Sequence, residues 1–248
     1  MGEWVVLFWL ALAFVGLILI SRWLTRHIQG LGLLIFEDER PALGLYYLAL
    51  FPGVLLHELS HLVAAKSLGV RTGKLSLFPR RRGDDEILLG SVQISRTDPV
   101  RASLIGLAPL LVGCAVILSI ARWGFELDDP GHPLSGRWIE ILVVSLKQPG
   151  FGLWLYLTFA VSNAMLPSGS DRREWLPALA FLAALLGGLY LLGWFPGIWL
   201  HLGEWALWAA QTLCYILGVS LAASAAFAVL VFVLERLAGW IRGMRVKY

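Results

Sequence analysis

The residues best suited to chemistry form one short run, His57-Glu58-Leu59-Ser60-His61. Residues four apart lie on one face of a helix, so the imidazoles of His57 and His61 can bind one metal ion from a single turn. Glu58 is rotated by about 100° from His57, beside the two ligands, where its carboxylate can take a proton from metal-bound water. Zinc lowers the pKa of such a water to about 7. The run therefore predicts a hydrolytic zinc centre.

The chain that carries this run is strongly apolar. Hydrophobic residues make up 58% of the sequence and charged residues 15%, with a mean hydropathy of +0.74. Soluble domains contain about 45–50% apolar and about 25% charged residues, so the composition indicates a membrane protein. The net charge of +3 gives no argument for nucleic acid. We therefore expect the protein to contact a lipid bilayer and not to bind nucleic acid.

The apolar residues gather in stretches that predict membrane-spanning helices. A span needs about 20 apolar residues to cross the hydrocarbon core. Six segments meet this requirement, at about 4–21, 42–65, 101–121, 151–166, 175–196 and 205–235. The expected fold is therefore an all-α membrane protein of about six transmembrane helices. Since nothing in the sequence separates a second domain, residues 1–248 are expected to form a single polytopic domain.

The basic residues predict how these spans are oriented. Most of the 20 Lys and Arg residues fall in the segments 66–101, 167–174 and 236–248. Loops rich in Lys and Arg stay on the cytoplasmic side. The pattern favours a multi-pass protein of the cell membrane with both termini in the cytoplasm.

Two loops carry patterns of their own. Residues 73–79 and 87–95 are rich in strand-forming residues and flank a charged, turn-like segment at 80–86, which predicts a small membrane-associated β-hairpin on the cytoplasmic side. Residues 137–147 are apolar with charged ends and too short to span, so we expect an interfacial helix there.

A purely structural role for the His57–His61 run is the alternative. Polar side chains can hold membrane helices together through hydrogen bonds. However, Glu58 is the only acidic residue well inside a predicted span. A bare carboxylate at that depth costs at least about 2.5–3.5 kcal/mol, which favours a bound metal over a polar cluster.

A third metal ligand is expected from another segment, because catalytic zinc usually has three protein ligands. The best candidate is Asp171, which follows the span at 151–166. Two crossings separate the ends of this span and the one at 42–65, so Asp171 and His61 lie on the same face. The alternative is an ordinary loop acid beside two arginines. The remaining histidines fall in segments predicted on the other face and are expected to be interfacial or solvated, namely His27, His132 and His201.

Together with Asn163 and Pro167, these residues resemble the motifs of the site-2 protease family of intramembrane zinc metalloproteases. In that family a later helix ends in an Asn-x-x-x-Pro-x-x-x-Asp-Gly-like element, and here Asn163, Pro167 and Asp171 have the same spacing. The resemblance implies that one zinc ion per chain is bound by His57, His61 and Asp171. It also implies that Glu58 is the general base and that Asn163 holds the substrate backbone or the developing oxyanion, within a catalytic core at about 42–175.

Two departures from the family pattern are visible. Arg172 follows the aspartate where the family commonly has Gly, and Leu107-Ala108-Pro109 followed by Gly113 replaces Ala-Gly-Pro and Asn. The function that the resemblance implies is hydrolysis of peptide bonds within or near the transmembrane segments of membrane-protein substrates, as in regulated intramembrane proteolysis. The hairpin would offer an edge strand to an extended substrate. The alternative is a non-catalytic relative, embedded in the membrane, that binds metal or substrate.

Overall fold

The computed structural model describes residues 3–82, 86–127, 146–166 and 196–244, with short stretches between 180 and 193. Its helices are α1 (Glu3–Phe36), α2 (Glu39–Ser67), α3 (Pro99–Ser119), α5 (Phe151–Ala164) and α8 (Pro196–Arg242), and the π-helical turn η1 (Ile120–Gly124) extends α3. Its strands are β1 (Thr72–Ser76), β2 (Arg80–Arg82), β3 (Glu86–Leu88) and β4 (Ser91–Ile94).

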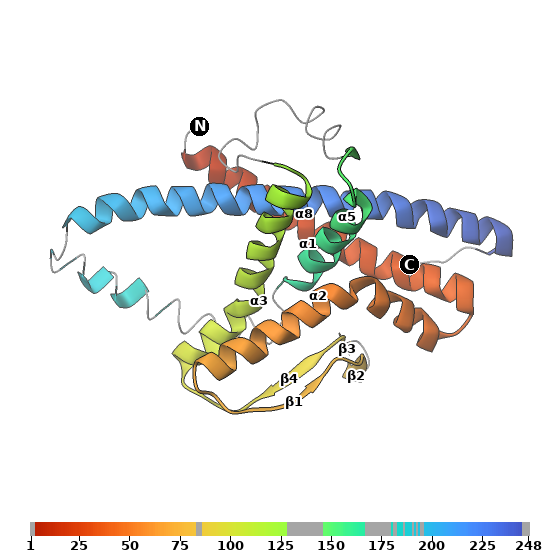
Figure 1. Ribbon diagram of the computed structural model, residues 1–248, viewed down its shortest axis with the longest axis horizontal. Helices are drawn as coiled ribbons and strands as arrows, with labels where there is room; N and C mark the ends of the chain where they lie inside the picture. Colours follow the sequence, from red (N-terminus) through yellow and green to blue (C-terminus); the bar gives the residue numbers. More distant parts are fainter. Residues whose placement is uncertain are drawn as a thin grey trace.

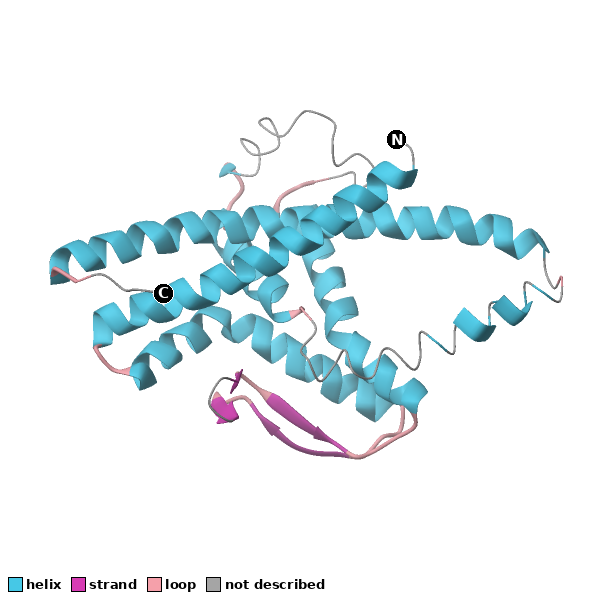
Figure 2. Ribbon diagram, turned by 180° about the vertical axis from the view of Figure 1, so that it is seen from behind, coloured by secondary structure: helices cyan, strands magenta, loops and turns pink. Residues whose placement is uncertain are grey.

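The helices form one bundle around the middle of α8. As Figure 1 shows, α1, α2 and α8 run lengthwise, and α3 and α5 cross between α2 and α8. Helix α1 packs against α8 and α2, and α5 packs against α2 and α8. The strands lie on the outer side of α2, away from α8 (Figure 2). Helix α2, which carries the His57–His61 run, therefore lies between the strands and the rest of the bundle.

Two aspartates fix where α2 and α3 begin. The backbone N–H of Arg40 donates to Asp38 and that of Arg101 donates to Asp98, as N-caps. The bond from Arg101 holds the pKa of the Asp98 carboxyl below its usual value. Because each cap fixes the residue at which its helix begins, the two caps also help to determine which later residues of α2 and α3 lie opposite each other.

Among the described residues, four helices are long and apolar enough to cross a membrane, over Trp4–Phe36, Glu39–Ser67, Pro99–Gly124 and Gly203–Arg242. They confirm the first, second, third and sixth predicted spans as helices and extend each of them. The fourth predicted span is the 14-residue helix α5. At 1.5 Å per residue it is only about 21 Å long. The predicted span at 175–196 and the interfacial helix at 137–147 lie mostly outside the described residues.

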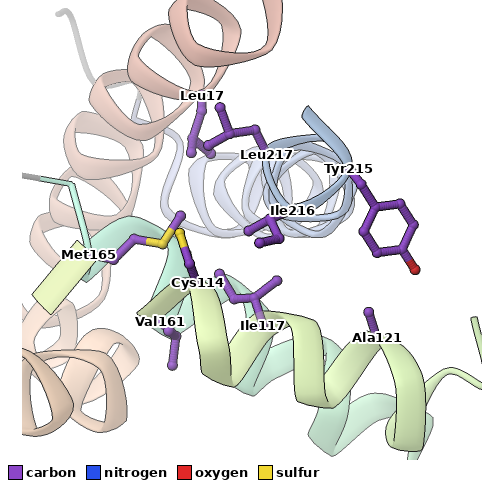
Figure 3. Packing of buried hydrophobic residues seen from close by; sticks show 9 residues of the cluster. All are labelled: Leu17, Cys114, Ile117, Ala121, Val161, Met165, Tyr215, Ile216 and Leu217. Atoms are coloured by element: carbon purple, nitrogen blue, oxygen red, sulfur yellow. The ribbon is translucent and has the colours of Figure 1, made fainter. Parts of the chain in front are cut away.

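Large apolar side chains are exposed along the outer faces of the two longest helices. On α1 and α8 they include Phe8, Val15, Leu19, Val229, Val233 and Trp240. In water such a surface would be a large unpaired apolar patch, whereas in a bilayer it faces lipid. The inner faces meet in a buried cluster to which α1, α3, α5 and α8 all contribute (Figure 3), including Leu17, Ile117, Val161 and Ile216.

The ends of α1 and α8 lie together, which the sequence did not predict. Glu37 forms an ion pair with Arg242, and the His27 ring bonds to Glu235 at 2.5 Å. This pairing places the C-terminal ends of the two helices side by side. Helix α1 continues through residues 22–36, beyond the predicted span at 4–21. The expectation that both termini lie in the cytoplasm stays a prediction.

The predicted β-hairpin is confirmed as two consecutive pieces of antiparallel ladder. Strand β1 pairs with β4, and β2 pairs with β3. The Arg80–Arg82 run, expected in the turn, is strand β2 instead, because the hairpin reaches beyond Pro79 and closes further out. Between the two pieces, Leu89 and Gly90 interrupt the second arm. Leu89 packs there against the buried cluster that includes Val54 and Phe159, so this corner of the hairpin enters the helical bundle.

Helices α2 and α5 cross in very close contact at Gly53. A Cβ placed on Gly53 would overlap the carbonyl oxygen of Ala160 and lie 2.8 Å from the Cβ of Ala164. On the other side of α5, a Cβ on Gly113 of α3 would lie 2.6 Å from the Cβ of Met165. Small residues allow this approach of membrane helices. The C-terminal end of α5 is therefore held between α2 and α3.

We predict that Gly53→Ala lowers the thermal unfolding temperature in detergent, because the new methyl group meets the backbone of α5. Overpacking of this kind costs roughly 1–3 kcal/mol. Gly44→Ala in the same helix is the matched control, since nothing lies within 4 Å of a Cβ at Gly44. Its unfolding temperature should equal or slightly exceed that of the wild type. Equal melting of the two variants would contradict the close crossing.

Candidate metal centre

The two histidines of α2 turn the same ring nitrogen toward each other. The Nε2 atoms of His57 and His61 lie 3.2 Å apart. The two rings are nearly perpendicular, with an angle of 82° between their planes. His61 is buried with 8% of its surface exposed. The helical spacing predicted a shared face, and the structure brings the two nitrogens together on it.

Each histidine is held in this orientation by a backbone carbonyl of another helix. Nδ1 of His57 lies 2.7 Å from the carbonyl oxygen of Ala164 in α5, and Nδ1 of His61 lies 2.9 Å from that of Ile105 in α3. A carbonyl oxygen can only accept, so Nδ1 carries the proton in both rings. In a neutral imidazole the other nitrogen, Nε2, then holds the lone pair. Both lone pairs are directed into the space between the rings.

This arrangement fits a zinc ion. Zinc binds imidazole nitrogen at about 2.0–2.1 Å in tetrahedral geometry, which places two such nitrogens about 3.3 Å apart. The observed separation of the His57 and His61 Nε2 atoms is 3.2 Å. Hydrogen bonds from the far ring nitrogen to backbone carbonyls are the usual support of zinc-binding histidines. Within the part of the chain that the structure describes, no group of three His, Cys, Asp or Glu side chains converges, so the candidate ligands there are the two histidines.

Glu58 is buried next to these ligands and contacts the hairpin. Only 7% of its surface is exposed. A Cβ placed on Gly90 would lie 2.8 Å from its Oε1 and 2.7 Å from its Cγ. The hairpin backbone can therefore approach the carboxylate only because residue 90 has no side chain. Sequence reasoning missed Gly90, although an isolated glycine within a strand pattern is a known signal of close backbone approach.

Asn163 is placed near the site but its amide group faces α8. Its Nδ2 donates to the carbonyl of Phe159 at 2.8 Å and to the hydroxyl of Ser224 at 3.2 Å. Its Oδ1 is buried and has no hydrogen-bond partner among the described residues. Asn163 thus links α5 to α8, one residue before the carbonyl that holds His57. The role toward substrate that the family resemblance implies stays a prediction.

The proposed third ligand lies outside the described residues. This applies to Asp171 and also to Pro167 and Arg172. The described part of this segment leaves the end of α5 directly beside His57, because Ala164 is the last residue of that helix. The segment that leads to Asp171 therefore leaves α5 at a point next to the histidine pair.

The other histidines do not join the pair within the described structure. His27 stacks on Trp23 at 3.8 Å and bonds to Glu235, so it lies partly buried between α1 and α8. His132 lies outside the described residues, and His201 belongs to α8.

Comparisons with protein-family models, with curated proteins and with solved structures found no match to this chain.

Proposed function

We propose that this protein is a zinc-dependent intramembrane endopeptidase of the site-2 protease type. The observation that carries the proposal is the histidine pair, whose Nε2 atoms lie 3.2 Å apart while both Nδ1–H groups donate to backbone carbonyls. A buried carboxylate, Glu58, lies in the same helical turn. Two neutral imidazoles aligned in this way are favourable around a cation, and an acid beside them is what hydrolysis requires.

The zinc ion would be held by His57, His61 and Asp171. Asp171 follows Ala164 by seven residues. An extended chain covers about 3.3–3.6 Å per residue, so this length is ample for the carboxylate to return to His57. With three protein ligands, one tetrahedral position stays open to substrate or water.

The chemistry would be general-base hydrolysis. Zinc, when bound, would polarise the scissile carbonyl and lower the pKa of a nearby water. The Glu58 carboxylate would accept a proton from the attacking water as its oxygen bonds to the carbonyl carbon. When the C–N bond breaks, Glu58 would return this proton to the leaving amine. Burial of Glu58 keeps bulk water away and strengthens its interactions.

The substrate would be the transmembrane segment of another protein. A helix hides its carbonyls in internal hydrogen bonds, so the segment must become extended before attack. Strand β4 lies between β1 and α2 (Figure 1), and of the described strands it pairs only with β1. Its other edge faces the helix that carries the proposed centre. An extended substrate could pair with that edge by strand addition, which would place its backbone next to Glu58.

The proposed location is the cell membrane, with the hairpin facing the cytoplasm. The loop that contains the hairpin, residues 66–101, holds more basic residues than any other loop. Basic loops of this kind stay on the cytoplasmic side. The peptide bond would then be cut toward the cytoplasmic end of the substrate segment.

The first prediction is that purified protein binds about one zinc ion per chain, as expected for a single centre with one open position. His61→Asn should reduce the bound zinc strongly, and Asp171→Ala should lower it as well. His27→Asn is the matched control, because His27 is also a partly buried histidine of a long apolar helix but pairs with Glu235. The measurement is elemental analysis after removal of loosely bound metal. Equal zinc in His61→Asn and wild type would contradict the site, and unchanged zinc in Asp171→Ala would exclude that ligand.

The second prediction concerns Glu58→Gln, which keeps the shape of the side chain but removes its basicity. Zinc content should be unchanged, and cleavage of a transmembrane peptide in phospholipid vesicles should fall by about 10²–10⁴-fold. Cleavage at the wild-type rate would rule out Glu58 as the base. If wild type and Glu58→Gln both bind zinc and neither cleaves any peptide of a varied panel, the protein is a non-catalytic relative.

The third prediction tests the contact between Glu58 and the hairpin. Gly90→Ala should displace the carboxylate while zinc affinity stays the same. A shift of about 1 Å can lower kcat by about 100-fold. Gly73→Ala is the matched control, because its Cβ would also meet a flexible polar side chain, Gln93 Oε1 at 2.7 Å, but away from the centre. Equal kcat values for the two variants would show that the Gly90 contact does not position Glu58.

A further inference from the structure

The carbonyl that holds His61 belongs to a helix interrupted by a proline. In an α-helix the N–H of residue i bonds to the carbonyl of residue i−4. Residue 109 of α3 is Pro109, which has no N–H. The carbonyl of Ile105 therefore lacks the usual donor from within its own helix. His61 supplies one instead, through Nδ1–H at 2.9 Å.

Both partners of this bond are buried, with His61 8% and Ile105 4% exposed. A buried carbonyl without a donor is costly, so this oxygen has a strong preference for the imidazole N–H. Once Nδ1 donates, Nε2 carries the lone pair and is directed at the Nε2 of His57. The proline thus influences the direction of the His61 ring nitrogen through the Ile105 carbonyl.

The histidine at the other side of the pair is held in a comparable way. Its acceptor, the Ala164 carbonyl, belongs to the last residue of α5, where a helix also leaves carbonyls without internal donors. A second helix proline shows the same arrangement away from the pair. Pro52 of α2 leaves the Leu48 carbonyl without its usual N–H donor, and the hydroxyl of Tyr156 donates to this carbonyl at 3.2 Å.

We propose that Pro109 is a positioning residue of the metal centre. By removing one backbone N–H, it reserves the Ile105 carbonyl for His61 and so fixes both the tautomer and the orientation of this ligand. This inference rests on the proposed zinc site, but the tautomer of His61 can be measured without zinc.

The test compares two replacements at position 109. Pro109→Ala restores the N–H, so Ile105 regains its bond within α3 and His61 loses its acceptor. Loss of such a support lowers metal affinity about 10- to 100-fold, measured by competition with a zinc chelator. Replacing Pro109 with lactic acid gives an alanine-like residue joined by an ester, which has neither the proline ring nor an N–H. This variant should bind zinc about as tightly as the wild type.

Pro52→Ala is the matched control in α2. It also restores one N–H within a helix and competes for a carbonyl that a side chain of another helix uses, but this side chain is Tyr156, which is not part of the histidine pair. Its zinc affinity should stay near that of the wild type. Alanine favours helix over proline at both positions, so each variant is expected to keep its helix.

The second readout is nitrogen NMR of metal-free protein labelled at histidine, with the His61 signals assigned by their loss in His61→Asn. Wild type and the lactic acid variant should show His61 protonated at Nδ1, and Pro109→Ala should show a larger fraction protonated at Nε2.

An unchanged tautomer and unchanged zinc affinity in Pro109→Ala would overturn the inference while leaving the zinc site in place. An equal loss of affinity in the lactic acid variant would also overturn it, since the ring and not the N–H would then be responsible. If the wild type bound no zinc, the proposed function would fail, and the tautomer measurement would still decide whether Pro109 positions His61.

Discussion

A backbone carbonyl in the apolar interior of a membrane protein needs a hydrogen-bond donor, because neither lipid nor an aliphatic side chain can provide one. Most of the carbonyls here are satisfied within their own helices. Those of Ile105 and Ala164 are not, one because of a proline and one because a helix ends, and both accept from a histidine of α2. The cost of leaving them unpaired is what holds the two imidazoles in place. The geometry of the centre thus follows from where two neighbouring helices are incomplete.

These bonds also require that three helices approach closely. The contact of Gly53 with Ala160 lets the end of α5 reach His57, and Gly113 lets α3 close on the same end from the other side. In lipid, such packing has to replace the hydrophobic effect as the force between helices. In α3 this close contact is made by Gly113, which follows Pro109 in the same helix.

The sequence was informative where the interacting residues are close to each other along the chain. The i and i+4 spacing of His57 and His61 predicted a shared face, and two strand-like segments around a charged, turn-like segment predicted the hairpin. Ion pairs between helix ends are a different matter. Glu37 and Arg242 are charged residues near helix ends, and no local pattern tells that they meet. Counting basic residues loop by loop therefore could not reveal this pairing, nor the bond between His27 and Glu235.

The backbone carbonyls that orient the two histidines could not be predicted in the same way. Every residue has such a carbonyl, so the residue type does not show which one accepts a hydrogen bond. The side chains of Ile105 and Ala164 give no sign in the sequence that their carbonyls bind a histidine. Pro109 is the one signal, because it shows that the Ile105 carbonyl lacks its usual N–H donor. Gly90 was visible as an interruption of a strand, yet its partner lies more than 30 positions away in the chain. Residues that bind are recognised by their side chains. Residues that position the binding side chains are recognised by a missing backbone donor or a missing side chain. Their partners become visible only once the fold is known.

The histidines and the acid of the centre are supported in different ways, and this difference suits their proposed tasks. His57 and His61 are each fixed by a backbone carbonyl of a packed helix, which keeps the distance between their Nε2 atoms constant. Glu58 is instead covered by a corner of the hairpin at Gly90. A metal ligand has to stay in place, whereas a base that takes a proton from water and passes it to a leaving amine has to reorient between two partners. The contact with Gly90 limits the space around the carboxylate, and the hairpin is also the element that a substrate strand would join. Substrate binding and placement of the base would then occur on the same segment, so an extended peptide on β4 would meet the carboxylate in its working position.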